Sequence, residues 1–185
     1  IMCSPLNLEA TTSHFKKNNY YGLRKENLKF FAQGVMPATD FDGNLLLASA
    51  DSLALSPNGH GGSLKALIDS GSINEMARRG IEHVSYFQVD NPLVSVINPL
   101  FIGLHDLQSS DMSSRSLTKT GPFEKLGNFV STGDRISIIE YSDLPEEKAL
   151  EKEEDGRIKY RAGSPAIHVL RRDFIEQFAS GEIKL

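Results

Sequence analysis

The chain has 185 residues, enough for a sizeable core, with a formal net charge of −4 and a pI near 5.7. This acidic balance offers no basic field to a phosphate backbone, which argues against general nucleic-acid binding. A single cysteine, Cys3, excludes an internal disulfide and favours a reducing compartment, so we expect a cytoplasmic protein without a disulfide partner. No apolar run approaches the roughly 20 residues that span a bilayer, so we expect no membrane partner.

The first eighty residues alternate between helical and extended patterns. A helix is predicted over residues 7–18, with Asn7 as its cap. Asp42-Gly43 between two extended runs is a strong hairpin signal. A glycine loop at 57–62 opens a second helix, and a short third helix is expected to stop at Gly80. The extended runs predicted here cover residues 28–31, 35–39 and 44–48.

The second half continues the alternation. A buried strand is predicted over residues 84–89, and Asn98-Pro99 has the cap and first-turn residues of a helix. The charge run 146–155 is interpreted as a solvated helix or loop. Further strands are predicted at 112–118, 129–131, 135–139 and 166–170, with a turn at 132–134 and a last helix at 173–178. This order favours an α/β fold with a mixed, mostly parallel sheet flanked by helices.

The loop Pro57-Asn58-Gly59-His60-Gly61-Gly62 is the strongest functional signal. Glycines let a ligand approach the backbone, whose N–H groups then face base carbonyls or phosphates. His60 could donate to a carbonyl or pack on a ring. The alternative, of similar weight on composition alone, is a flexible connection before a helix.

Acidic residues at two places could hold a metal ion. Asp90 and Asn91 follow the strand 84–89, and an acid at a strand end is well placed to hold Mg²⁺ beside phosphates. The alternative there is an Asx turn set by Asn91-Pro92. The motif Asp40-Phe41-Asp42 is better explained by the hairpin turn than by a metal site.

A third candidate is Glu140-Tyr141, which closes the strand 135–139. A carboxylate there can accept sugar hydroxyls, and a tyrosine can stack or donate, although a cross-strand surface pair is an equal alternative. The five histidines lack zinc-ligand spacing. The chain also lacks a Gly-x-Ser-x-Gly motif and a P-loop, so neither nucleophilic catalysis nor an ordinary P-loop ATPase is supported.

Five segments of the chain are informative together, namely residues 30–38, 57–62, 89–93, 139–143 and 162–164. They resemble segments of the eukaryotic-type UDP-sugar pyrophosphorylases, closest to the UDP-N-acetylglucosamine branch. They occur in the family's order over nearly the whole chain, which is far more specific than any one match. The resemblance implies a nucleotide-diphospho-sugar transferase domain of Rossmann-like fold.

The resemblance implies a uridylyltransferase that makes UDP-sugar and pyrophosphate from UTP and a sugar 1-phosphate, with Mg²⁺ as cofactor. By position, Gln33 would read the uracil edge and Gly59 would meet uracil through its backbone. Asp90 would be the metal ligand and catalytic residue near the α-phosphate. The remaining implied contacts are His60 to nucleotide and sugar, and Asn91, Glu140, Tyr141 and Ser164 to the sugar.

Two positions depart from the family's pattern, and both bear on which sugar the protein uses. His60 stands where acetylglucosamine enzymes often carry Asn, whereas UDP-glucose enzymes carry Gly-His-Gly, and Ser164 stands where the former place Asn. Alternative functions are therefore a UTP–glucose-1-phosphate uridylyltransferase or a non-catalytic UDP-sugar-binding protein of this fold. Residues 1–185 are expected to be the central part of an incomplete catalytic domain, with the family's glycine-rich phosphate loop preceding Ile1 and further lysines following Leu185. Alone, they are expected to show little turnover.

Overall fold

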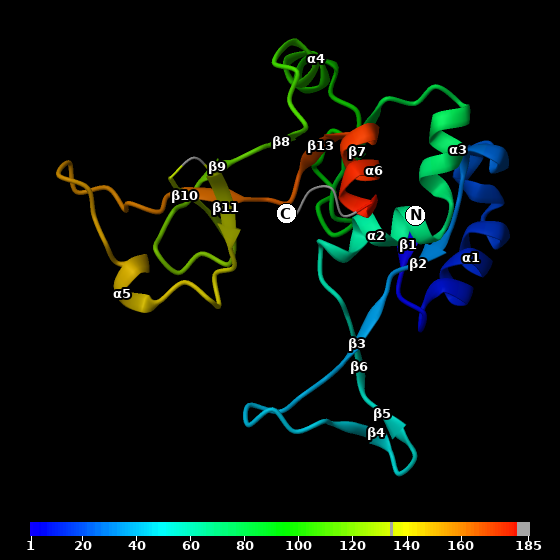
Figure 1. Ribbon diagram of the computed structural model, residues 1–185, viewed down its shortest axis with the longest axis horizontal. Helices are drawn as coiled ribbons and strands as arrows, with labels where there is room; N and C mark the ends of the chain where they lie inside the picture. The colour runs from blue at the N-terminus through cyan, green and yellow to red at the C-terminus, as the bar shows by residue number, and fades with distance from the viewer. Residues whose placement is uncertain (134, 181–185) are drawn as a thin grey trace. The chain divides into compact units, whose positions relative to one another are not determined.

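The computed structural model describes residues 1–133 and 135–180 (Figure 1). These residues form two compact units. The first unit contains Ile1–Glu82 and the chain from Arg172 onward, and the second contains His83–Arg171. The chain therefore passes between the units twice, at residues 82–83 and at residues 171–172. Each unit is described by itself below.

The first unit begins with a parallel pair of short strands. β1 (Met2–Cys3) lies beside β2 (Phe31–Ala32), and the connection between them contains α1 (Leu8–Lys17), because parallel strands need a crossover of this length. The helix predicted over 7–18 is thus confirmed. Phe15 of α1 packs edge-on against Phe30, with ring centroids 5.1 Å apart, which holds α1 to the chain entering β2. Two 3₁₀ turns, η1 (Asn19–Gly22) and η2 (Lys25–Asn27), complete the crossover.

Three helices supply most of the first unit's core. α2 (Gly62–Asp69), α3 (Ser72–Arg78) and α6 (Arg172–Ser180) contact one another. Their apolar faces bury Leu64, Ile73 and Ile175, and Ile175 is fully enclosed. α3 ends before Gly80, whose positive φ of 66° permits the chain reversal predicted there.

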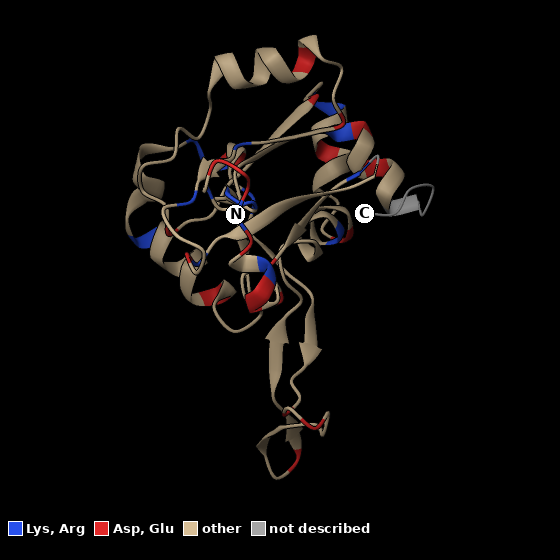
Figure 2. Ribbon diagram, turned by 90° about the vertical axis from the view of Figure 1, so that its left-hand side faces the viewer, with Lys and Arg blue, Asp and Glu red and all other residues tan. Residues whose placement is uncertain are grey.

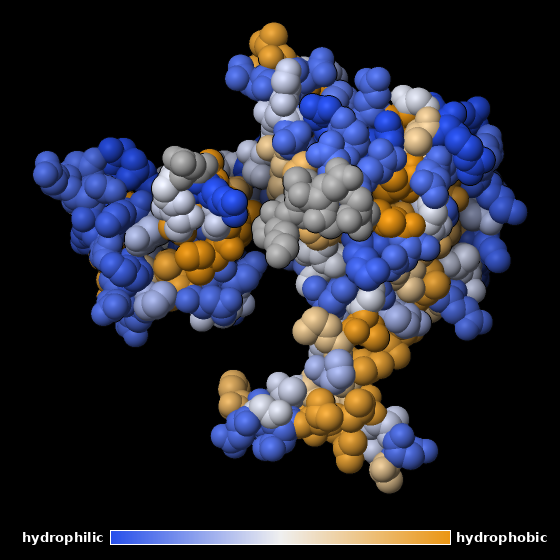
Figure 3. Space-filling view, in the orientation of Figure 1, coloured by the Kyte–Doolittle hydropathy of each residue, from blue (hydrophilic) through white to orange (hydrophobic). Residues whose placement is uncertain are grey.

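An arm of four short strands leaves the helices of the first unit (Figure 1). β3 (Val35–Pro37) pairs with β6 (Leu55–Pro57), and β4 (Leu47–Ser49) pairs with β5 (Ser52–Leu53). The charged residues of the arm are all acidic (Figure 2). Several of its large apolar side chains are exposed, giving the arm an apolar surface (Figure 3), and they include Met36, Leu47, Leu53 and Leu55.

Within this arm the predicted turn at Asp42-Gly43 is present, but the strand before it has a different partner from the one predicted. Asp40 accepts hydrogen bonds from the backbone of Asp42 and Asn44, and Thr39 forms an antiparallel bridge with Leu45. The side-chain amide of Asn44, which donates to Asp40 at 3.0 Å, and then its backbone N–H hold the pKa of the Asp40 carboxyl below its usual value. β3, however, pairs with the returning strand β6 instead of residues 44–48, because the chain turns again between β4 and β5.

The described residues of the second unit form two antiparallel sheets. In the first, β13 (His168–Arg171) lies between β7 (His83–Tyr86) and β8 (Met112–Ser114), and α4 (Pro99–Leu107) contacts β13. Asn98 caps α4 by accepting a hydrogen bond from the backbone N–H of Phe101, as its sequence predicts. Val169 and Leu170 are the buried apolar residues of β13.

The other sheet has the strand order β11, β10, β12, β9. β10 (Gly127–Thr132) and β11 (Arg135–Ile139) form the predicted hairpin, with Gly133 at a φ of 66°; Asp134 lies outside the described residues. β12 (Ala162–Ser164) joins β10 to β9 (Leu117–Thr118). A Cβ on Gly163 would meet Leu126 at 2.8 Å, so glycine permits the close packing here.

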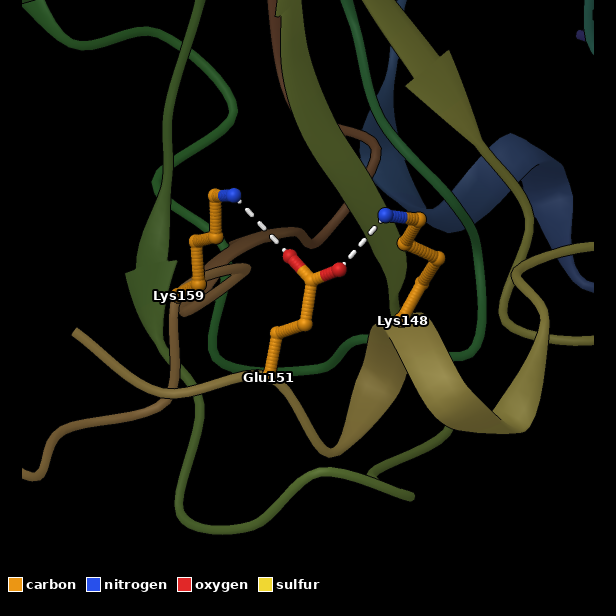
Figure 4. Close-up of polar contacts among 3 residues, drawn as sticks. All are labelled: Lys148, Glu151 and Lys159. Atoms are coloured by element: carbon orange, nitrogen blue, oxygen red, sulfur yellow. Dashed lines mark hydrogen bonds and ion pairs between the residues drawn. The ribbon is translucent and has the colours of Figure 1, made fainter.

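The charge run of the second unit forms α5 (Glu146–Ala149) and a three-residue ion cluster (Figure 4). Glu151 accepts hydrogen bonds from Lys148 at 2.5 Å and from Lys159 at 2.9 Å. The bond from Lys148, then that from Lys159, holds the pKa of the Glu151 carboxyl below its usual value. The run is thus a short helix followed by a charge-paired loop, as expected of a solvated segment.

The expected mixed α/β fold is confirmed, but the expected mostly parallel sheet is wrong. Among the described residues, β1 and β2 form the one parallel pair, and all other strand pairs are antiparallel. The physical reason lies in the connections, since β10 reaches β11 through a turn too short for the crossover that parallel pairing needs.

Within the part of the chain that the structure describes, no helix is both long and apolar enough to cross a membrane.

Candidate functional site

The candidate base-reading residues of the first unit meet directly. Gln33 follows β2, and its backbone N–H donates to the carbonyl of Cys3 at 2.7 Å, which ties it to β1. Its side-chain Nε2 donates to the carbonyl of Gly59 at 2.5 Å. This bond joins two motifs that lie 26 residues apart in the sequence. The glutamine and the glycine loop are therefore in direct contact.

Asn58 packs between two glycines of these same motifs. Its backbone N–H donates to the carbonyl of Gly34 at 3.2 Å. A Cβ on Gly34 would lie 2.8 Å from its Nδ2, and one on Gly62 would lie 1.9 Å from its Oδ1. Both positions therefore need glycine while Asn58 keeps this place. Sequence reasoning missed this role, although Asn58 stands inside the loop that it singled out.

The glycine loop opens a helix, as predicted. Gly59 has a φ of 76°, a conformation that few other residues adopt, and His60 is exposed. The carbonyl of His60 accepts from both the backbone N–H and the hydroxyl of Ser63, at 3.0 and 2.6 Å, which fixes the start of α2. These contacts connect the loop to the first turn of α2.

In the second unit, Asp90 and Asn91 lie in a turn after β7. The side-chain oxygen of Asn91 accepts from the backbone N–H of Leu93 at 3.2 Å, so the Asx turn of the alternative reading is present. Asp90 is exposed. The described residues contain no group of three or more acidic, histidine or cysteine side chains that could hold a metal ion. One exposed carboxylate fits Mg²⁺ in the mode where substrate phosphates and water supply the other ligands.

Glu140 and Ser164 approach each other across Gly127. Glu140 follows β11, and Ser164 ends β12, where it pairs with Gly127. A Cβ on Gly127 would lie 3.6 Å from the Glu140 Oε1 and 3.7 Å from the Ser164 Cβ. The sheet thus places an exposed carboxylate and a buried hydroxyl residue on the two sides of one glycine. Such a pair can accept from and donate to hydroxyl groups.

Tyr141 is half-exposed and lines a pocket of about 90 Å³. Lys119 and Asn128, both buried, line the same pocket. Sequence reasoning missed these two residues and Gly127, because the strand pairing that gathers them is not visible in local patterns. The other lining residues are Pro122, Phe123, Leu144 and Ala149.

The sequence-predicted site residues fall into two groups, one in each unit. Gln33, Gly59 and His60 belong to the first unit, and the structure brings Gln33 and Gly59 into contact. The second unit carries Asp90 and Asn91 on one loop. Its other sheet brings together Glu140, Tyr141 and Ser164.

Comparison with known proteins shows the family of the chain. The family model described as UTP–glucose-1-phosphate uridylyltransferase matches residues 1–163, which include every one of these residues except Ser164. The chain belongs to this family.

Relatives within the uridylyltransferase family include a protein of Schizosaccharomyces pombe named probable UDP-N-acetylglucosamine pyrophosphorylase, 38% identical over 180 residues. The UDP-N-acetylglucosamine pyrophosphorylase of Saccharomyces cerevisiae is 34% identical over 178 residues. These matches cover 96% of this chain in both cases, but 38% and 37% of the relatives. The chain thus spans well under half the length of these relatives.

Solved structures agree with this family assignment. The crystal structure of an Entamoeba histolytica protein assigned as a UDP-N-acetylglucosamine pyrophosphorylase has a TM-score of 0.84 and 33% identity. That match covers 100% of this chain and 45% of the solved one. The resemblance inferred from five sequence segments is therefore confirmed, and so is the expected α/β fold apart from the direction of most of its strands.

Proposed function

We propose that the natural protein carrying these residues is a uridylyltransferase that makes UDP-N-acetylglucosamine and pyrophosphate from UTP and N-acetylglucosamine 1-phosphate. The hydrogen bond from Gln33 to Gly59 carries the proposal, because it joins the family's two base-reading motifs in one place. Residues 1–185 then represent the central part of a nucleotidyltransferase domain, in a cytoplasmic enzyme.

Base recognition is assigned to the first unit. A planar amide and a backbone amide side by side match the edge of uracil, which offers both carbonyl acceptors and an N–H donor. The bond between Gln33 and Gly59 fixes their spacing before a nucleotide arrives, which lowers the entropy lost on binding. Asn58 keeps Gly59 at that spacing by packing between Gly34 and Gly62.

The reaction is a displacement at phosphorus. An oxygen of the sugar 1-phosphate attacks the α-phosphorus of UTP, a new P–O bond forms, and the bond from the α-phosphorus to the bridging oxygen breaks to release pyrophosphate. Such chemistry needs positioning and charge neutralisation more than a covalent nucleophile. Asp90 would hold Mg²⁺ near the α-phosphate, and the ion supplies neutralisation of phosphate charge when bound.

Sugar recognition is assigned to Glu140, Tyr141 and Ser164. The carboxylate of Glu140 accepts from sugar hydroxyls, and Ser164 lies close by across Gly127. Tyr141 offers a ring face and a hydroxyl at the rim of the small pocket. Asn91 and His60 are the remaining candidates for the sugar, with His60 beside the base site.

The test is a substrate panel with the full-length protein. Purified protein is mixed with Mg²⁺, UTP or ATP, and the 1-phosphates of N-acetylglucosamine or glucose, and pyrophosphate release is measured. We expect release with UTP and N-acetylglucosamine 1-phosphate, and little with ATP. Higher kcat/KM for glucose 1-phosphate would move the assignment to the alternative sugar. Release with no pair would overturn the enzymatic proposal.

Gln33→Ala in the same panel tests the observation that carries the proposal. Loss of hydrogen bonds in a partly buried polar site removes about 1–3 kcal/mol, or about 5- to 150-fold in uridine-nucleotide affinity. The weakening should be the same for UDP and UDP-N-acetylglucosamine, since both carry uracil. An unchanged Kd for both ligands in a folded Gln33→Ala protein contradicts the base assignment.

A further inference from the structure

Lys119 is a lysine enclosed within the second unit, with 5% of its surface exposed. It directly follows β9, and its backbone N–H donates to the carbonyl of Arg161 at 2.8 Å, beside the start of β12. Its Nζ donates to the side-chain oxygen of Asn128 at 2.6 Å and to the carbonyl of Pro122 at 3.1 Å. Both acceptors are uncharged, so this ammonium group is held by hydrogen bonds to neutral oxygens in a place where burial lowers its pKa.

Asn128 connects Lys119 to the end of the neighbouring strand, β11. Its side chain is fully buried, and its Nδ2 donates to the carbonyl of Ile139 at 3.2 Å. Ile139 is the last residue of β11 and directly precedes Glu140 and Tyr141. The chain of contacts from Lys119 through Asn128 therefore ends at the backbone that carries both residues.

The stem of Lys119 contacts a second strand with a candidate sugar residue. A Cβ on Gly163 would lie 3.1 Å from the Lys119 Cγ, so the stem packs directly against β12 beside Ser164. One side chain thus contacts β12 with its methylene groups and reaches β11 through its ammonium group. These are the two strands whose ends supply Glu140, Tyr141 and Ser164.

The pocket that Lys119 lines is too small to be the sugar site itself. Its volume of about 90 Å³ is well below the roughly 300–1,000 Å³ of small-molecule sites. Tyr141 forms part of its wall, so the pocket lies behind a candidate contact residue. Lys119 is therefore placed to support the sugar-binding residues from within the sheet.

We propose that Lys119 is a positioning residue of the sugar subsite, fixing Glu140 and Tyr141 through Asn128 and fixing Ser164 through its stem. This inference rests on the proposed function, because it assigns a role within that same subsite. It differs from a purely structural role, in which the buried lysine would support folding and leave the balance between sugar and nucleotide binding unchanged.

The experiment compares Lys119→Met with Lys125→Met in the full-length protein. Methionine keeps much of the stem and removes the ammonium group, and Lys125 is an exposed lysine close by in sequence. We expect Lys119→Met to raise the KM for the sugar 1-phosphate about tenfold or more and the KM for UTP less than twofold. Lys125→Met should leave both constants unchanged. Equal changes in both KM values for Lys119→Met, or no change in either, would overturn the inference.

A double-mutant cycle tests the route through Asn128. Asn128→Ser removes the amide that holds the Ile139 carbonyl and leaves Lys119 in place. If the two residues act through one route, the effects of Lys119→Met and Asn128→Ser on the sugar KM will not add in the double variant. Full additivity would contradict that route. If Lys119→Met does not fold, Asn128→Ser alone takes its place, with the same expected split between the two KM values.

A binding measurement separates this inference from the proposed function. Calorimetry gives the Kd of UDP and of UDP-N-acetylglucosamine for each variant without turnover. Lys119→Met should reduce the extra affinity contributed by the sugar and leave UDP affinity unchanged. A wild-type protein that binds the sugar nucleotide in this way but makes none contradicts the proposed function alone. A wild-type protein that gains no affinity from the sugar contradicts the inference as well.

Discussion

Asn58 determines how closely the two motifs that we propose to read the base pack in the first unit. Its amide occupies the space that a methyl group at Gly62 would need, whereas a Cβ on Gly61 would meet no described atom within 4 Å. Glycines of the same loop are therefore required on different physical grounds. At Gly62 the reason is the close approach of a neighbour, and at Gly59 it is the positive φ.

Gly62→Ala should therefore weaken the base site, and Gly61→Ala should not. The added methyl group displaces Asn58 and costs about 1–3 kcal/mol of unfolding free energy, as overpacking does elsewhere. We expect uridine-nucleotide affinity to fall with it, measured by titration calorimetry and thermal unfolding. The double variant Gly62→Ala/Asn58→Ala should recover part of the stability, because the smaller residue removes the collision. Equal effects of Gly61→Ala and Gly62→Ala would contradict this packing argument.

At the scale of elements, α4 is held to its sheet through a buried histidine. His105 is 1% exposed, its Nδ1 lies 2.8 Å from the hydroxyl of Ser113 on β8, and its ring meets His83 of β7 with centroids 5.3 Å apart. Burial is the main cause that lowers the pKa of His105, and His83 and Arg171 lower it further, against opposing effects of Asp106 and Asp111.

This arrangement predicts acid sensitivity of the second unit. Because the folded pKa of His105 lies below its usual value near 6.5, the unfolded chain binds the proton more tightly. The contribution of His105 to stability is therefore complete above pH 6.5 and is lost as the pH falls toward the folded pKa. We expect His105→Phe to reduce the loss in Tm between pH 8 and pH 5.5.

The control for this comparison is His14→Gln, which changes an exposed histidine of α1 in the first unit. It should keep the wild-type difference in Tm between the two pH values. The same pH dependence in His105→Phe and wild type would show that other groups dominate.

Elements with local signals were predictable from the sequence. The Asn98-Pro99 start of α4, the stop at Gly80 and the turn after Asp40 depend on neighbouring residues, and each is present. Strand partners were not predictable to the same degree. β12 is Ala-Gly-Ser, which has no apolar alternation, and its strand character depends on β10 and β9 beside it.

In the candidate site, too, residues in local motifs were predictable, whereas residues brought together by strand pairing were not. Gln33, Gly59 and Glu140 were predicted because they stand in segments that resemble the family. Lys119 and Asn128 were not singled out from the sequence. A lysine in a polar segment is usually exposed, and no local pattern indicates that Lys119 is buried. Only the pairing of β9, β12 and β10 brings that lysine into the interior.

At the scale of the whole chain, each unit has its own core, and α6 returns to complete the first. Ile175 of α6 is fully buried, and α6 contacts both α2 and α3. The first unit is therefore built from two separated stretches of sequence. The second is continuous, and its first and last residues, His83 and Arg171, are paired in the register of β7 and β13.

We expect residues 83–171 to fold when produced by themselves, and residues 1–82 to fail without α6. The first expectation follows from paired ends and an internal core, and the second from the loss of Ile175. Dispersed amide signals in NMR spectra and a cooperative thermal transition would identify a folded segment. A cooperative transition in residues 1–82 alone would show that α6 is dispensable to that core.

The pairing of His83 with Arg171 also bears on how such a chain changes over evolutionary time. A segment whose two ends are adjacent is topologically an insert, and protein domains tolerate insertions of this kind. The residues assigned to uracil lie in the host, and those assigned to the sugar lie in the insert except for His60. Replacement of this insert would therefore change most of the proposed sugar contacts while the proposed uracil contacts are kept.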